Sequence, residues 1–401
     1  MARRWRLGLR SLPLVTAGVA LLAVGCSGDL DAQAGPEPIT VEPNESPVVA
    51  GKEHFLVSTG DAGRPTHLVR VGEAGQVAFP EDRGLISGTQ LDDGSWFILN
   101  SSCQGSTGVC GDVGGMTIDD EGAVTATGEL WDVPGTYEVI GSAGPLVAVS
   151  ARTDTETTAW WVDTGTVTAE SYAYRSAPYD SVAIRDAANE AGGTKEFDVP
   201  RFRFCVSDDW VYVLASPAHL GSAAAPSRVV EIVPVPTDAD RQARLFEVGV
   251  DGLDAREAGA LMCDDDGLRS VSVGPSADGG SEVRLTSMEL ATGEAREQAV
   301  ASYDTPLVDL YGGGDDRALI SVSDLGPIDQ GAENSSEGSA EEASPSTPED
   351  EPPSELQLVT DEGEQLVIGP QAPSGPAVLS LDGRWVMQPD GASVSITAVG
   401  G

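Results

Sequence analysis

The sequence has little positive charge and only three histidines. Its 401 residues include 23 lysine and arginine residues against 64 aspartate and glutamate residues, which gives a formal net charge of −41. A surface of this sign repels the phosphates of nucleic acids and the headgroups of anionic lipids. Neither nucleic acid nor an anionic headgroup is therefore expected as a partner.

Catalytic and metal-binding motifs are also missing. There is no G-x-S-x-G nucleophile elbow, and the only histidines are His54, His67 and His219, in different parts of the chain. The stretch CDDDG (263–267) has consecutive acids, whereas a calcium loop of the EF-hand kind needs alternating ones. Aspartate and glycine are common in tight turns. We therefore predict a turn here, and no catalytic residue, metal site or cofactor. An enzyme whose site is assembled from separate strands remains an alternative.

The N-terminal residues predict export and lipidation. A basic stretch precedes an apolar run over 11–25, which is shorter than the about 20 residues of a membrane-spanning helix. The sequence AVGC (23–26) resembles the lipobox of bacterial lipoproteins, although Ala23 stands where leucine is usual. This resemblance implies a signal peptide over 1–25, fatty acylation of Cys26, with palmitate among the expected chains, and anchorage at the extracytoplasmic face of the cell membrane. An ordinary cleaved signal peptide is the alternative.

Two biased stretches delimit and interrupt the remaining chain. Residues 26–44 are polar and contain prolines, which is typical of a flexible tether. Residues 327–355 are rich in acids, serine and proline and contain no lysine or arginine. Such a segment cannot bury enough apolar surface to offset the entropy lost on ordering. We therefore predict one folded domain over 45–401 with a disordered acidic insertion at 327–355.

Two repeating patterns of short strands make up that domain. In the first, an acidic turn precedes an apolar strand, as in LDDGSWFIL (91–99), VSDDWVYVL (206–214), DDDGLRSVSV (264–273) and LDGRWVM (381–387). In the second, glycine lies in the turn of a hairpin, as in MTIDDEGAVTA (116–126) and AWWVDTGTVTA (159–169). Glycine suits these turns because tight hairpins need a positive φ. Alternating apolar and polar residues predict strands throughout.

The spacing of these strands predicts a β-propeller. Equivalent strands begin near residues 55, 96, 146, 210, 269, 317 and 384 and divide the domain into seven units. Strand-only units at intervals of this size are typical of propeller blades. The glycine hairpins are similar to the outer hairpins of quinoprotein-like and other bacterial propeller repeats, although we identify no tryptophan at a fixed position. The predicted fold is all-β, a β-propeller of seven four-stranded blades. Six or eight blades, or a pair of β-sandwiches, are the alternatives.

The two ends of the domain predict how the ring closes. PITVEP (38–43) is a lone strand candidate before the first unit, and SVSITAV (393–399) ends the last one. An N-terminal strand that completes the C-terminal blade leaves fewer exposed strand edges. We expect this pairing.

Four cysteines other than Cys26 predict two disulfides, because exported proteins commonly pair their cysteines. Aligning FCVSDDW with MCDDDGL places Cys205 and Cys263 at the same position of the innermost strands of adjacent blades. Such positions approach within the range of a disulfide, about 4.4–6.8 Å between Cα atoms. Cys103 and Cys110 flank a short loop and form the second predicted pair.

One segment, 172–204, is nearly neutral on this acidic chain and rich in tyrosine and arginine, residue types that are common at the energetic centres of interfaces. It predicts a partner-binding face, with the candidate residues Tyr172, Tyr174, Arg175, Tyr179 and Arg185. The alternative is a long connection whose aromatic residues pack on a blade.

Together these features predict an extracytoplasmic lipoprotein whose propeller binds or scaffolds an envelope protein, a peptide or a glycan. The bilayer is its second partner, through the acyl chains on Cys26. A propeller enzyme, such as a hydrolase or lyase acting on an extracellular polymer, and a ligand-sensing domain are the alternatives.

Overall fold

A computed structural model describes residues 48–399 with internal gaps. The gaps are 53, 59–65, 71–72, 78–82, 103–110, 154–155, 176–200, 217–227, 237–240, 256–257, 278, 305–307, 315–316, 324–353, 361–362, 371–376 and 391–392. Five predictions lie wholly or largely outside the described residues: the signal peptide, the tether with Cys26, the strand at 38–43, the Cys103–Cys110 pair and the acidic insertion, of which only 354–355 are described.

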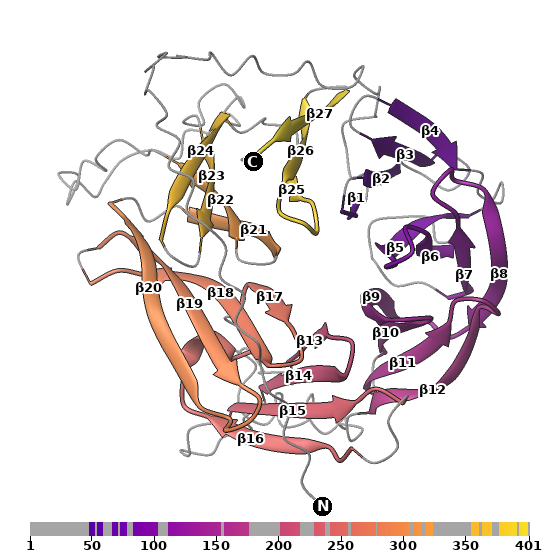
Figure 1. The fold of residues 1–401 in the computed structure, drawn as a ribbon, viewed down its shortest axis with the longest axis horizontal. Helices are drawn as coiled ribbons and strands as arrows, with labels where there is room; N and C mark the ends of the chain where they lie inside the picture. Colours follow the sequence, from indigo (N-terminus) through magenta and orange to yellow (C-terminus); the bar gives the residue numbers. More distant parts are fainter. Residues whose placement is uncertain are drawn as a thin grey trace, which may run out of the picture. The chain divides into compact units, whose positions relative to one another are not determined.

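The described chain folds into seven antiparallel sheets, in each of which consecutive strands are hydrogen-bonded neighbours (Figure 1). The first three sheets contain β1 (Val48–Ala50), β2 (His54–Ser58), β3 (Thr66–Arg70) and β4 (Glu73–Val77); β5 (Gly84–Gln90), β6 (Trp96–Ser101), β7 (Val113–Ile118) and β8 (Val124–Trp131); and β9 (Thr136–Ala143), β10 (Leu146–Arg152), β11 (Thr157–Asp163) and β12 (Thr168–Arg175). The fourth and fifth contain β13 (Arg201–Val206), β14 (Trp210–Ser216), β15 (Arg228–Pro234) and β16 (Arg244–Val248); and β17 (Ala260–Cys263), β18 (Gly267–Pro275), β19 (Ser281–Glu289) and β20 (Ala295–Tyr303). The last two contain β21 (Val308–Gly314), β22 (Arg317–Ser323), β23 (Ser354–Thr360) and β24 (Gln365–Pro370); and β25 (Val378–Leu379), β26 (Trp385–Asp390) and β27 (Ser393–Ala398).

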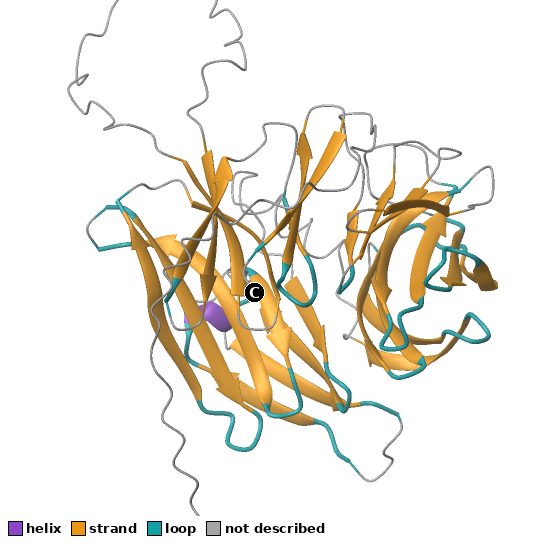
Figure 2. Cartoon of the chain, turned by 45° about the horizontal axis from the view of Figure 1, so that its top comes forward, coloured by secondary structure: helices purple, strands orange, loops and turns teal. Residues whose placement is uncertain are grey.

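This topology is that of a β-propeller, but the predicted blade composition needs correction. The structure has six four-stranded blades instead of the predicted seven, because the last sheet contains only three strands among the described residues. We number the sheets as blades 1 to 7 in chain order. The first strand of each blade contacts the first strand of the next, and β25 contacts β1. Figure 2 shows that strands dominate the described chain, which has one short 3-10 turn at Asp251–Leu253.

The predicted repeat corresponds to a constant place in the blade. All seven predicted starting points fall on the second strand of a sheet, from β2 to β26. These strands are buried on both sides, as β6 illustrates. Trp96 and Ile98 pack in the cluster shared with blade 1, whereas Phe97 and Leu99 pack in the cluster shared with blade 3. Burial of each such side chain contributes about 1.5–3 kcal/mol. A strand buried on both faces reads as a continuous apolar run, which is why the sequence reveals it.

The core consists of seven apolar clusters, each shared by two consecutive blades. The cluster between blades 7 and 1 closes the ring with Phe55 and Val57 from β2 and Met387 and Ile396 from β26 and β27. The backbone N–H of Leu381 also donates a hydrogen bond to the carbonyl oxygen of Gly51 at 2.9 Å. Packing of blade 7 on blade 1 therefore closes the described ring.

The hairpin glycines only partly follow the expected turn geometry. Gly122 and Gly293 have φ angles of 88° and 70° and lie in predicted outer hairpins, where a positive φ favours glycine. In the hairpin between β11 and β12, however, Val167 has the positive φ, 50°, and Gly165 does not. Val167 is buried in the cluster of blades 2 and 3, so apolar packing offsets the backbone strain at this residue.

Two further features differ from the expectation. Trp96, Trp210 and Trp385 each occupy the first position of a second strand, so tryptophan does recur at a fixed place in three blades. Strand β23 begins at Ser354, so the last two residues of the predicted insertion at 327–355 belong to a blade.

Among the described residues, no helix is long and apolar enough to span a membrane.

Candidate binding site beside the innermost strands

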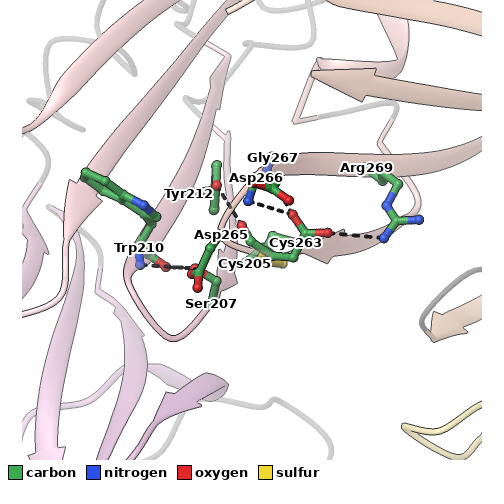
Figure 3. Close-up of a disulfide and its surroundings, with 10 residues drawn as sticks. Cys205, Ser207, Trp210, Tyr212, Cys263, Asp265, Asp266, Gly267 and Arg269 are labelled. Carbon is green, nitrogen blue, oxygen red and sulfur yellow. Dashed lines mark hydrogen bonds and ion pairs between the residues drawn. A yellow bond between two sulfur atoms is a disulfide. The ribbon is translucent and has the colours of Figure 1, made fainter. Parts of the chain in front are cut away.

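A disulfide joins the innermost strands of blades 4 and 5. Cys205 is the penultimate residue of β13, Cys263 is the last residue of β17, and a disulfide bond joins them (Figure 3) with their Cα atoms 6.0 Å apart. This is the pair that the aligned acidic turns predict. Both cysteines pack against the apolar cluster shared by the two blades. The disulfide therefore holds two adjacent inner strands together where the two acidic turns begin.

The acidic turn of blade 5 also caps the turn of blade 4. The carboxylate of Asp265 accepts a hydrogen bond from the Ser207 hydroxyl at 2.9 Å (Figure 3). It accepts another from the Asp209 backbone N–H at 3.2 Å. Tyr212 donates its phenolic hydrogen to the carbonyl oxygen of Asp264 at 2.8 Å. Desolvation by burial, and then the nearby carboxylates of the acidic turn, raise the pKa of Tyr212. The two turns are thus interlocked by side chains as well as by the disulfide.

The remaining aspartate contacts explain this turn without a metal ion. One oxygen of Asp264 accepts the backbone N–H groups of Asp266 and Gly267, both at 2.9 Å, and Arg269 lies 3.4 Å from the other oxygen. This is the side-chain-to-backbone bonding that makes aspartate common in turns. In the part of the chain that the structure describes, no three histidine, cysteine, aspartate or glutamate side chains are grouped as metal ligands.

A cavity of about 520 Å³ lies beside this disulfide-linked pair of strands, and we call it the inner cavity. Strands β9, β10 and β11 of blade 3 form one wall, and residues of β13 and of the segment entering β17 form the other. Its described lining residues are Thr136, Glu138, Val139, Ile140, Ser150, Arg152, Thr157, Phe202, Arg203, Phe204, Gly259 and Leu261. The lining combines charged, hydroxyl and apolar side chains, which is typical of ligand sites.

The register of blade 3 places its polar lining residues on one face. Arg152 lies directly opposite Thr136 on β9 and Thr157 on β11. Two residues earlier on β10, Ser150 lies opposite Glu138. Because residues two apart on a strand point to the same side of the sheet, these five side chains form two adjacent rows facing the cavity.

The opposite wall is braced by hydrogen bonds and aromatic packing. The Nε and Nη1 atoms of Arg203 donate to the carbonyl oxygens of Ala255 at 3.2 Å and Gly259 at 2.9 Å. These bonds tie β13 to the chain that enters β17. Phe202 and Phe204 contact the ring of Tyr174, with centroid distances of 5.9 and 5.8 Å. The wall is therefore supported from the outer strand of blade 3 as well as from blade 5.

Glu138 is the only carboxylate among the described lining residues of the inner cavity. Its side chain is exposed to solvent, and protein atoms of the cavity walls partly desolvate its carboxyl group. The resulting desolvation raises the pKa of Glu138 above its ordinary value of 4.5, and the positive charge of Arg203 opposes this effect.

Among the three predicted partner-binding residues that the structure describes, Tyr174 lies apart from Tyr172 and Arg175. Tyr174 packs between blades 3 and 4, and burial raises its pKa to about 12. Tyr172, which is 42% exposed, instead contacts Trp160, at a ring-centroid distance of 3.8 Å. Arg175 lies over the Tyr172 ring and 3.3 Å from Glu156. A shift in the register of β11 and β12 accompanies this separation of the two tyrosines.

The other two predicted partner residues, Tyr179 and Arg185, lie outside the described residues. Residues that the sequence does not single out, Arg152 and Glu138, instead line the inner cavity. The one available signal was Arg152 itself, a charged residue that directly ends the apolar run PLVAVSA (145–151). Arg203 belongs to the segment 172–204, so this part of the predicted face does reach the cavity.

Comparison with solved structures shows a distant similarity to other β-propellers. The chain is similar to prolyl endopeptidases with a TM-score of 0.46 and 12% identity, over 87% of this chain and 45% of theirs. It is similar to the tricorn protease with a TM-score of 0.49 and 11% identity, over 93% of this chain and 35% of that one. The Dos1 propeller gives a TM-score of 0.43 and 11% identity, over 92% and 96% of the two chains.

These similarities concern the fold alone. The chain spans less than half of the length of the two proteases that it matches. No protein family's sequence profile matches it, and neither does any curated protein sequence.

Proposed function

We propose that this protein is a binding module that holds part of an envelope protein, a peptide or a glycan in the inner cavity. The observation that carries the proposal is the lining of that cavity, which places Arg152, Glu138 and three hydroxyl groups opposite two phenylalanines. Blades 3 and 4, which provide most of the lining, bury their opposite faces against blades 2 and 5. A rigid, mixed lining of this kind suits recognition, because little conformational entropy is lost on binding.

The place of action that we propose is the extracytoplasmic face of the cell membrane. The support is the N-terminal sequence, in which a signal peptide over 1–25 is followed by the lipobox-like Cys26. Acyl chains on Cys26 would hold the protein at the bilayer, and residues 26–44 would act as the tether that gives the propeller its reach.

We further propose that residues 38–43 provide the fourth strand of blade 7. The supporting observation is the strand order β25-β26-β27, in which the outermost place, filled by a fourth strand in blades 1 to 6, is not filled by a described strand. The residues PITVEP alternate apolar and polar side chains as a half-buried edge strand does. Blade 7 would then be four-stranded, as the sequence repeat predicts.

Site-specific photocrosslinking in intact cells tests the proposed binding function. A photoreactive amino acid in place of Thr136, an exposed residue of the cavity, is expected to capture a discrete envelope partner. The matched control places the same group at Val124 on the outer strand β8, which is 41% exposed. Equal capture from both positions, or none from Thr136, would contradict a binding function centred on the inner cavity.

A further inference from the structure

We infer that the inner cavity binds a peptide segment through a free carboxylate, with Arg152 as the residue that anchors this group. The inference rests on the proposed binding function and names its ligand class. Phe202 and Phe204 on the opposite wall would take an apolar side chain next to the carboxylate.

Arg152 differs from most of the arginines whose side chains the structure describes, because it has no acidic partner among the described residues. Seven other arginines lie within 4.0 Å of a carboxylate: Arg83, Arg175, Arg241, Arg269, Arg284, Arg296 and Arg384. Among the described residues, Arg152 makes neither an ion pair nor a side-chain hydrogen bond, although its side chain is exposed and lines the inner cavity. The sequence contains 64 aspartate and glutamate residues. An arginine that pairs with none of the described ones is suited to binding an external anion.

The neighbours of Arg152 fit a carboxylate better than a more highly charged anion. Thr136 and Thr157 lie directly beside it in the register, so their hydroxyl groups can donate to the same ligand oxygens. A guanidinium group matches the two oxygens of a carboxylate. Glu138, one row away on the same face, adds a negative charge that disfavours a doubly charged phosphate.

The rest of the lining favours a peptide over a glycan. Five lining residues are apolar, namely Val139, Ile140, Phe202, Phe204 and Leu261. A hydroxyl-rich sugar would leave much of this apolar surface unmatched, whereas an apolar amino-acid side chain would cover it. Arg203 contributes positive charge to the same wall, where two of its N–H groups are held by backbone carbonyls. These observations together indicate a short peptide that ends in, or carries, a carboxylate next to an apolar residue.

The test measures binding of N-acetylated tripeptides with apolar last residues to the purified full chain by calorimetry. The same peptide pool is offered once with free C-terminal carboxylates and once as C-terminal amides. We expect the free acids to bind about tenfold more tightly than the amides, a difference of about 1.4 kcal/mol, because only the carboxylate can form a charge-assisted pair with the guanidinium group. Arg152→Gln should remove this preference. Arg296→Gln, which changes an arginine that is 79% exposed on β20, should preserve it.

Several outcomes would overturn the inference. These are equal affinity for acids and amides, an unchanged preference in Arg152→Gln, binding of hexuronate oligosaccharides but not of peptides, and displacement by inorganic phosphate as effective as by acetate. Unaltered thermal unfolding of Arg152→Gln serves as the folding control. If peptides fail to bind while Thr136 still captures a partner in cells, the binding function stands and the carboxylate inference falls. If both fail, both are contradicted.

Discussion

At the scale of single residues, the ionised carboxylate of Glu138 lowers the free energy of unfolding at neutral pH, because it is partly desolvated in the folded state. Desolvation raises its pKa above 4.5, and Arg203 only partly offsets this effect. The folded state therefore holds the Glu138 proton more tightly than the unfolded state does. As the pH rises from 4.5 through the raised pKa, the unfolded state loses its proton first, so the free energy of unfolding decreases. The decrease persists at higher pH.

Removing that ionisable group should stabilise the protein at neutral pH. We expect Glu138→Gln to have a higher Tm than the wild type at about pH 7.5, and the difference to vanish near about pH 4, where both states are protonated. The measurement is thermal unfolding by circular dichroism across this pH range. Glu294→Gln, at an exposed position of an outer hairpin, serves as the control and should show no such pattern. A lower Tm of Glu138→Gln at neutral pH would refute the assignment.

Single residues are also where sequence reasoning reaches least far. Cys205 and Cys263 can be paired because each precedes a similar acidic turn, so the repeat itself places them side by side. Arg152 and Glu138 belong to different strands and meet only through the register of β9 with β10. Tyr174 resembles an interface residue in the sequence, but the blade geometry buries it between blades 3 and 4. Such placements depend on contacts between sheets that no local pattern encodes.

At the scale of strands and turns, the link between blades 4 and 5 should be an important source of stability. The disulfide closes a loop with a sequence separation of 58 residues, and Asp265 caps the neighbouring turn beside it. Replacing Cys205 and Cys263 by serine should lower the free energy of unfolding by about 2–4 kcal/mol, chiefly because the unfolded chain regains entropy. Denaturant unfolding measures this loss.

The comparison for this prediction uses a chain in which Cys103 and Cys110 are already serine, so that only one disulfide changes. A thiol reductant should lower the stability of that parent to the level of the Cys205→Ser, Cys263→Ser variant and should leave the variant unaffected. Equal denaturation midpoints for parent and variant would mean that side-chain packing between the two blades already holds the strands together.

Strands differ in how well the sequence reveals them, for a physical reason. The second strand of each blade forms an apolar run, and in blades 2, 4, 5 and 7 it also follows an acidic turn, so both features are visible in the sequence. The outer hairpins are marked by their turns, as at Gly122 and Gly293. The short strand β25 has only two residues, Val378 and Leu379, and carries too little pattern to be recognised. Blade 7 therefore departs most from the prediction.

At the scale of the whole molecule, the net charge of −41 opposes compactness, because like charges repel more strongly in the folded chain than in the expanded one. Ion pairs at the surface offset little of this repulsion. In the pair Arg296–Glu294, for example, the side chains are 79% and 66% exposed. Most of the repulsion is therefore relieved by counterions, and the stability of the fold should depend on ionic strength.

Raising sodium chloride from about 0.01 to about 0.1 M shortens the screening length from about 30 to about 10 Å, so the Tm should rise.

The same change should weaken binding of free-acid peptides to Arg152, because screening reduces attraction between opposite charges as well. Thermal unfolding and calorimetry on one preparation would measure the two effects. Calcium chloride at equal ionic strength is the control. If calcium stabilised the protein far more than sodium, bound cations would explain the effect, and general repulsion would not. If salt left peptide binding unchanged, the contact with Arg152 would not be an ionic one.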